Sequence, residues 1–272
     1  MTGLPFGADS ALPLGDDPLP IDGAFTVADG ATPDTAVVTA VAWPWLFAFA
    51  ASGTARCAML VLAGGGYTQL MVGREGVQVA RWLVGLGIDA FVAVHRFPTA
   101  QTSPQAPVDD VVAAMRLIRA RGYGQVGVIG LSSGGHLAAC LLTDRVAANA
   151  KPDVAIIGYA PISTNAAGRT VVPDKPPLDP PAKQALYDLY QPDVQLAPDP
   201  PPTFIAYSAS DPVVPVANAY RLNDALVARG GRSEVHAFAD APHGFALDTR
   251  EGPVTLWPAL AAAWLRQGRF ID

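Results

Sequence analysis

The sequence contains little charge and little cysteine. Of its 272 residues only 15% are charged, 50% are hydrophobic, and the formal net charge is −6. It has no run of basic residues, and an acidic chain of this kind is a poor partner for nucleic acid or an anionic membrane surface. The two cysteines, Cys57 and Cys140, make neither a disulfide framework nor a metal-ligand spacing, so we expect two buried thiols. These scarcities exclude a nucleic-acid-binding protein and a disulfide-stapled one.

The sequence also lacks a recognisable targeting or membrane-spanning segment. Its N-terminus shows neither the basic region nor the apolar region of a signal peptide. The most apolar stretch, residues 36–50, is too short to span a bilayer, contains Pro44 and is typical of strands. We therefore expect no membrane partner and a cytoplasmic protein, or a periplasmic or secreted one if a leader has been removed.

Short apolar runs alternate with helical patterns along most of the chain. Runs typical of buried strands cover residues 57–63, 88–94, 125–131, 154–160, 203–209 and 233–239. Apolar residues at helical spacing occur in residues 75–86, 108–121, from about 133, near 216–229 and near 254–266. This alternation predicts an α/β fold whose mostly parallel central sheet is covered by helices on both faces. A length of 272 residues fits one such domain.

Two segments fall outside this alternation. Residues 1–35 are rich in Gly, Pro and Asp, and we expect them to form an extended N-terminal arm. Residues 161–202 are rich in proline and leave room for one short helix at 181–190. An insertion of this length in a compact domain is usually functional or disordered. We interpret it as a small lid over the carboxyl ends of the strands, with a plain surface excursion as the alternative.

The stretch VIGLSSGGHLAA, residues 128–139, places two serines between a predicted strand and a predicted helix. Gly130, Ser132 and Gly134 fit the pattern G-x-S-x-G, in which a sharp turn exposes the central hydroxyl. This register selects Ser132 as a nucleophile and leaves Ser133 to offer its backbone N–H to a developing negative charge. The alternative for Ser132 is an ordinary helix N-cap. The strand before it and the helix after it favour the nucleophile.

A serine nucleophile needs a base, and His243 is the best candidate among the four histidines. It lies in DAPHGFAL, in a loop that directly follows a predicted strand, where catalytic bases are often found. Asp211, in SASDPVVP, follows another strand and is the candidate acid, with Asp240 as its rival. The chain order Ser132, Asp211, His243 is the order that α/β-hydrolases use.

A glycine run follows the strand at 57–63. The loop AGGGY, residues 63–67, lets backbone N–H groups approach a substrate without intervening side chains, as an oxyanion-binding loop requires. A phosphate-binding loop is the competing interpretation. The run, however, lacks the Lys-Ser/Thr of a P-loop and the full G-x-G-x-x-G pattern.

Three segments resemble bacterial α/β-hydrolase esterases of the acetyl-xylan esterase and feruloyl esterase type. They are AGGGYTQLMVGREGVQVARWLVGLGIDAFVAVHRFP, GVIGLSSGGHLAA and DPVVPVANAYRLNDALVARGGRSEVHAFADAPHGFAL. That group is related to the dienelactone hydrolases and prolyl oligopeptidases. The resemblance implies the α/β-hydrolase fold and a catalytic triad of Ser132, Asp211 and His243. For the oxyanion hole it implies backbone N–H groups of Ser133 and of Gly65 or Gly66. Ser133 stands where that group more usually has alanine.

The sequence therefore predicts a serine esterase that cleaves carboxylic esters through an acyl-enzyme and needs no metal or organic cofactor. The expected substrates are small-molecule or carbohydrate esters with short acyl groups, including acetyl groups on sugars. Tyr67, His95 and Phe245 are the substrate-pocket candidates, with core packing as the alternative for the aromatic pair. Two other functions stay open, namely a peptidase or amidase with the same triad and a non-catalytic ligand-binding homologue. The sequence does not determine the oligomeric state.

Overall fold

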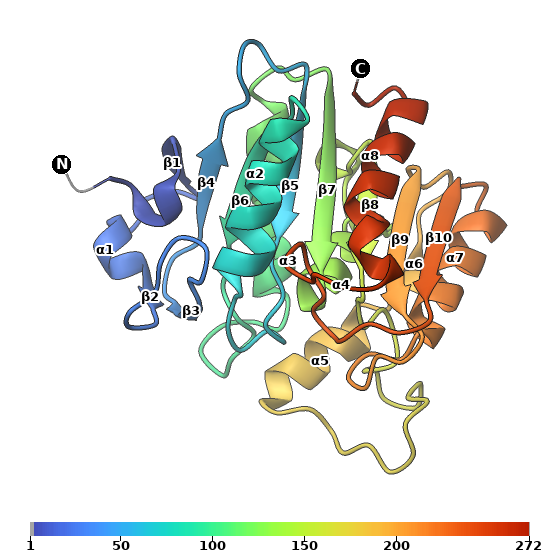
Figure 1. The fold of residues 1–272 in the computed structure, drawn as a ribbon. Helices are drawn as coiled ribbons and strands as arrows, with labels where there is room; N and C mark the ends of the chain where they lie inside the picture. Colours follow the sequence, from blue (N-terminus) through green and yellow to red (C-terminus); the bar gives the residue numbers. More distant parts are fainter. Residues whose placement is uncertain (1–2, 272) are drawn as a thin grey trace.

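A central sheet of eight strands organises the computed structural model, which describes residues 3–271 (Figure 1). Across the sheet the order is β1 (Ser10–Pro13), β4 (Trp45–Phe49), β6 (Asp89–Val94), β5 (Cys57–Leu62), β7 (Gln125–Leu131), β8 (Ala155–Gly158), β9 (Thr203–Ser208) and β10 (Ser233–Phe238). Strands β5 to β10 run parallel to one another, whereas β4 is antiparallel to both of its neighbours. The predicted mostly parallel sheet is confirmed.

Alternate side chains along the strands face two separate layers of core. In β5, Met59 and Val61 face one layer, while Leu60 and Leu62 face the other. Helices α2 (Gln78–Gly85) and α8 (Trp257–Gln267) cover the first layer. Helices α3 (Ala106–Arg119), α4 (Ser133–Cys140) and α7 (Ala217–Ala228) cover the second, on the other side of the sheet (Figure 1). A sheet covered on both faces needs strands that are apolar on both faces, which explains their continuous apolar runs.

The N-terminal segment contains more regular structure than the extended arm that its composition predicts. Its described part contains η1 (Pro5–Gly7), β1, α1 (Ile21–Ala24) and β2 (Phe25–Val27). Strand β1 extends the main sheet beside β4, and β2 pairs with β3 (Val38–Val41) in a separate two-stranded sheet. Phe6 is buried and its ring packs against those of Phe25 and Phe47. A few apolar side chains thus attach this glycine- and proline-rich segment to the core.

The first part of the proline-rich segment 161–202 lies near the carboxyl ends of the parallel strands, and its last residues return to the start of β9 (Figure 1). It contains α5 (Pro181–Leu189), at the predicted position, and α6 (Pro192–Gln195). The buried ring of Tyr187 in α5 lies 5.6 Å from the ring of Tyr67 and 4.6 Å from that of His136. His136 Nε2 also lies 3.0 Å from the carbonyl oxygen of Tyr190. These contacts pack the segment against α4 and the glycine run.

Three further short helices complete the described chain. They are the π-helix η2 (Val72–Val77), η3 (Ala148–Ala150) and η4 (Pro253–Leu256). Within residues 3–271, none of the helices combines the length and apolar character needed to cross a bilayer.

Candidate active site

Ser132 occupies a strained turn between β7 and α4. Its φ of 52° and ψ of −125° lie in a region that residues other than glycine rarely adopt. The chain is so crowded here that a Cβ at Gly134 would stand 2.1 Å from the carbonyl oxygen of Leu62. A Cβ at Gly130 would stand 2.2 Å from the carbonyl oxygen of Gly134. The glycines therefore permit the close packing that forces the Ser132 hydroxyl out of the turn.

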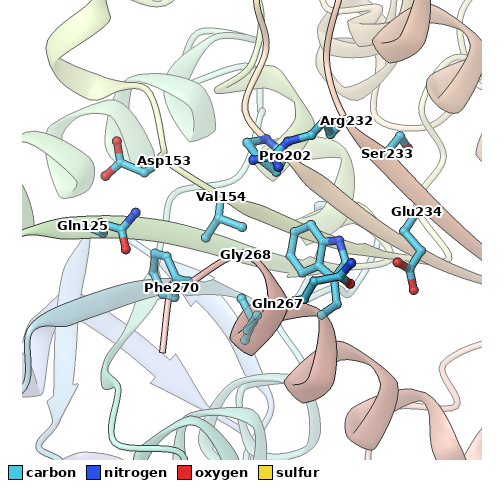
Figure 2. Close-up of a pocket in the computed structure, with 12 residues that line it drawn as sticks. Gln125, Asp153, Val154, Pro202, Arg232, Ser233, Glu234, Gln267, Gly268 and Phe270 are labelled. Atoms are coloured by element: carbon cyan, nitrogen blue, oxygen red, sulfur yellow. The ribbon is translucent and has the colours of Figure 1, made fainter. Parts of the chain in front are cut away.

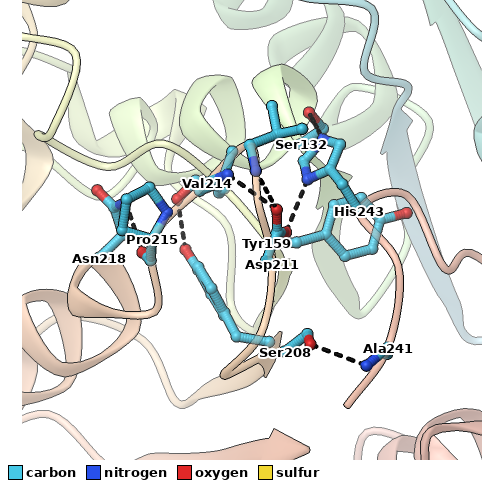
Figure 3. Close-up of polar contacts among 12 residues, drawn as sticks. Ser132, Tyr159, Ser208, Asp211, Val214, Pro215, Asn218, Ala241 and His243 are labelled. Carbon is cyan, nitrogen blue, oxygen red and sulfur yellow. Dashed lines mark hydrogen bonds and ion pairs between the residues drawn. The ribbon is translucent and has the colours of Figure 1, made fainter. Parts of the chain in front are cut away.

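The structure brings Ser132, Asp211 and His243 together at the carboxyl ends of β7, β9 and β10 (Figure 3). Ser132 Oγ lies 3.0 Å from His243 Nε2, and His243 Nδ1 lies 2.7 Å from Asp211 Oδ2. The side chain of Asp211 is 0% exposed, whereas that of His243 is 21% exposed. A hydroxyl, an imidazole and a carboxylate thus form one hydrogen-bonded series that leads from the solvent side into the protein.

Asp211 is held in place by its own loop. Its Oδ1 accepts hydrogen bonds from the backbone N–H groups of Val213 and Val214, at 2.8 and 2.9 Å. Burial by itself raises the pKa of Asp211, but the hydrogen bonds from His243 and the two N–H groups outweigh it and hold the pKa below its ordinary value. An ionised Asp211 keeps a proton on His243 Nδ1 and leaves Nε2 free to accept one from Ser132.

The other acid and base candidates have structural surroundings. Asp240 is exposed and accepts a hydrogen bond of 2.8 Å from a neighbouring serine hydroxyl. His236 lies on β10, where its Nε2 is 2.8 Å from a glutamate oxygen of the same strand. His95 and His136 are buried, and burial lowers the pKa of each imidazole, to about 4 in His136. The contacts and burial of these four residues account for them, so none of them is assigned as the acid or the base that serves Ser132.

The glycine run after β5 borders the turn that carries Ser132. Within residues 3–271, the backbone N–H groups of Gly65 and Ser133 donate no hydrogen bond to another group of the protein. Both are therefore available to bind an oxyanion. The N–H of Gly66, the alternative donor to Gly65, donates instead to the Ser133 hydroxyl oxygen at 2.9 Å. Of these two alternatives the structure therefore favours Gly65, and the Ser133 side chain fixes the glycine loop.

Two residues of η2 that the sequence pattern did not single out connect the loops around Ser132. Glu75 is 4% exposed, and its carboxylate accepts hydrogen bonds from the Gly64 N–H at 2.6 Å and the Tyr159 hydroxyl at 3.0 Å. The neighbouring Arg74 donates to the carbonyl oxygen of Gly244 at 3.1 Å, directly after the histidine of the site. The Tyr159 ring lies beside that histidine (Figure 3). Helix η2 therefore joins the glycine loop to the histidine loop.

Substituting Glu75 with glutamine is expected to change how stability depends on pH. Burial raises the pKa of Glu75, so the folded state holds this proton more tightly than the unfolded state does. The wild type therefore loses stability as the pH rises from the ordinary glutamate pKa to the raised pKa, by about 1.4 kcal/mol for each pH unit between the two values. Relative to the wild type, Glu75→Gln should become more stable over the same range.

Urea unfolding at a series of pH values measures this difference. The exposed Glu251 provides the matched control, since Glu251→Gln removes the same charge at the surface. Parallel pH profiles for the wild type and Glu75→Gln would contradict the assigned burial of the carboxyl group.

The three substrate-pocket candidates lie in the core beneath the site. Tyr67, His95 and Phe245 are each 1% exposed. The Tyr67 hydroxyl lies 2.8 Å from His136 Nδ1, and the Phe245 ring lies 4.5 Å from that of Tyr159. The structure thus corrects the pocket prediction, because these side chains are covered by their neighbours. Core packing, the alternative for the aromatic pair, is the role that their contacts describe.

A cavity of about 380 Å³ lies at the amino ends of the parallel strands, opposite to the end that carries Ser132 (Figure 2). Gln125 and Ser233, which line it, are the first residues of β7 and β10. Ser132 directly follows the last residue of β7, so the cavity and the nucleophile lie at opposite ends of that strand. The cavity is therefore separate from the Ser132 site.

The chain is similar in sequence to a known family and to two curated proteins. Residues 99–267 match the prolyl oligopeptidase family. The chain is 33% identical over 112 residues to an acetylxylan esterase of Xylanibacter ruminicola, covering 39% of this chain and 23% of that protein. It is 30% identical over 193 residues to endo-1,4-beta-xylanase B of Butyrivibrio fibrisolvens, covering 63% and 29%. The chain thus spans less than a third of the length of either curated relative.

A solved structure matches over nearly the full length of both chains. It is the acetyl ester-xyloside bifunctional hydrolase from Caldicellulosiruptor lactoaceticus, with a TM-score of 0.72 and 26% identity over 97% of this chain and 98% of that one. The family match covers more than half of the present chain and includes all three residues of the hydrogen-bonded series. The chain therefore belongs to the prolyl oligopeptidase family and has the α/β-hydrolase fold.

Proposed function

We propose that the protein is a serine esterase that hydrolyses carboxylic esters through an acyl-enzyme intermediate. The observation that carries this proposal is the hydrogen-bonded series of Ser132, His243 and Asp211 beside two unengaged backbone N–H groups. Similarity to an acetylxylan esterase and to an acetyl ester hydrolase supports short acyl groups, including acetyl groups on carbohydrates. No step of this chemistry requires a metal or an organic cofactor.

In the acylation step, Ser132 Oγ attacks the carbonyl carbon of the ester while His243 Nε2 accepts the hydroxyl proton. The carbonyl oxygen becomes an oxyanion, which the N–H groups of Gly65 and Ser133 stabilise. The negative charge of Asp211 stabilises the imidazolium that forms. Collapse of the intermediate breaks the bond to the alcohol oxygen, and His243 gives its proton to that leaving group.

In the deacylation step, water repeats the attack. His243 Nε2 takes a proton from the water as its oxygen adds to the acyl carbon, and the same N–H groups bind the second oxyanion. Collapse then releases the carboxylic acid and returns the proton to Ser132.

A peptidase or amidase that uses the same residues is the second candidate, favoured by the match to the prolyl oligopeptidase family. The two candidates differ in the leaving group, since an amine is a much poorer leaving group than an alcohol. Substrate preference therefore separates them.

Turnover of 4-nitrophenyl esters of increasing chain length, compared with aminoacyl 4-nitroanilides, tests the proposal. We expect kcat/KM for the acetyl ester to exceed that for any anilide by at least about a hundredfold, or roughly 2.7 kcal/mol of transition-state stabilisation. Faster cleavage of anilides would assign the site to a peptidase. Ester turnover no faster than that of a Ser132→Ala protein would reject catalysis at this site.

A further inference from the structure

Positive charge gathers beside the glycine loop of this acidic protein. The lysines of the chain are Lys151, Lys175 and Lys183, and the last two lie in the proline-rich segment. Lys183 Nζ lies 3.6 Å from the position that a Cβ on Gly66 would occupy. Gly66 follows Gly65, whose N–H is available to an oxyanion. The ammonium group of Lys183 therefore borders the place where the carbonyl of an ester would bind.

A packed helix fixes the position of Lys183. Lys183 and Tyr187 are four residues apart in α5, so their side chains lie on the same face of the helix. Tyr187 packs against Tyr67 of the glycine run and against His136 of α4. The face of α5 that contacts the glycine loop through an aromatic ring thus also presents an ammonium group to it.

The charge of Lys183 lacks a carboxylate partner. Within the described residues 3–271, Lys183 forms no ion pair, although the exposed Asp179 attracts it from a distance. Lys175 lies near enough to repel it and donates a hydrogen bond to Asn165. Partial burial lowers the pKa of both ammonium groups. Partly buried positive charge without a partner is unfavourable, and a bound anion would relieve that cost.

We propose that Lys183, with Lys175 behind it, binds a carboxylate group of the substrate, so that the preferred substrates are esters carrying a negative charge close to the scissile bond. This inference rests on the proposed function, because the ester must be cleaved by Ser132. An ester whose carbonyl oxygen accepts from the Gly65 N–H extends one of its two sides toward Gly66 and α5. A carboxylate on that side contacts the ammonium group of Lys183, whereas a neutral hydroxyl would leave the charge of Lys183 uncompensated.

Matched pairs of charged and neutral esters test this proposal. In one pair, 4-acetoxybenzoate and its methyl ester, the charge lies on the alcohol side, and release of acetate is measured. In the other, 4-nitrophenyl hydrogen succinate and its methyl ester, the charge lies on the acyl side, and release of nitrophenol is measured. Only one of the two pairs places its charge on the side that faces Lys183. For that pair, Lys183→Met is expected to lower kcat/KM of the charged ester by about tenfold and that of the neutral ester by less than about threefold.

Two further variants and a salt series complete the design. Lys151→Met removes the same charge just before β8, near the opposite edge of the sheet, and should leave both esters of each pair unaffected. Lys183→Arg should retain the preference for the charged ester. Raising sodium chloride to about 0.5 M shortens the screening length to about 4 Å and should reduce the wild-type preference.

Each outcome has a separate meaning. If Lys183→Met lowers kcat/KM equally for the charged and the neutral ester in both pairs, the inference is overturned and Lys183 is a structural residue of α5. Unchanged kcat/KM for all four esters would overturn it as well. Failure of the wild type to cleave any of the four esters would instead overturn the proposed function, from which the inference follows.

Discussion

Replacing Ser132 with alanine is expected to lower kcat for ester hydrolysis on the order of 10⁴- to 10⁶-fold, because it removes the hydroxyl on which the acyl-enzyme forms. The protein should remain folded, since the hydroxyl makes one hydrogen bond within the described residues 3–271, to His243, and alanine occupies less space. Steady-state turnover of 4-nitrophenyl acetate and the circular dichroism spectrum together measure both expectations.

Covalent labelling identifies which of the two adjacent serines reacts. A fluorophosphonate probe should label the wild type at Ser132 and fail to label Ser132→Ala. Ser133→Ala is the matched control. It keeps the backbone N–H for the oxyanion and loses the hydrogen bond from Gly66, so labelling should persist with roughly a fivefold loss of kcat, equivalent to about 1 kcal/mol. An adduct on Ser133, or labelling that survives in Ser132→Ala, would contradict the assignment.

Replacing Asp211 with asparagine is expected to lower kcat by roughly 10³- to 10⁴-fold. The amide oxygen can still accept from the N–H groups of Val213 and Val214, so the loop should keep its shape. The amide nitrogen then faces His243 Nδ1 and donates to it, which places the imidazole proton on Nε2. An Nε2 that carries a proton cannot accept one from Ser132.

Asp240→Asn is the matched control for this substitution, because Asp240 lies three residues before His243 and is exposed. It should leave kcat within about twofold of the wild type. A large loss in Asp240→Asn together with normal activity in Asp211→Asn would reverse the two roles.

Stability offers a second measurement on Asp211. Its lowered pKa makes a contribution to stability that is complete above the pKa of an unfolded aspartate and is lost as the pH falls to the lower folded value. The stability advantage of the wild type over Asp211→Asn should therefore shrink on acidification, which urea unfolding can follow. An advantage that grows as the pH falls would contradict the assigned hydrogen bonds.

The sequence predicted the features that depend on local pattern. The parallel strands appear as apolar runs because both of their faces are covered. The turn at Ser132 was visible because its flanking glycines are required by backbone contacts within a few residues or with the adjacent strand. Asp211 and His243 could be placed because the carboxyl ends of parallel strands meet at one edge of a sheet.

Features that depend on contacts between distant segments were not predicted. The pairing of β1 with β4 joins residues 10–13 to 45–48, which no local pattern reveals. The hydrogen bond from Gly66 to Ser133 spans 67 positions of the chain. One of the rings that cover Tyr67 belongs to Tyr187 of α5, whose place the composition of its segment does not determine.

One missed residue did leave a signal. Glu75 continues the helical spacing of Val79 and Leu83, so it stands on a face that is otherwise apolar. A carboxylate in such a position is seldom buried without hydrogen-bond partners. The spacing could therefore have indicated that Glu75 holds a neighbouring loop.

The π-helical form of residues 72–77 makes the site sensitive to chain length as well as to side-chain identity. A π-turn contains one residue more than an α-turn, and each residue turns a helix by about 100°. If one residue were deleted here while α2 kept its apolar face on the sheet, Arg74 and Glu75 would be rotated about the helix axis by about 100°. They could then no longer face the histidine loop and the glycine loop. Homologues that differ in length at this turn must therefore align their two loops by other contacts, even where every residue of the triad is retained.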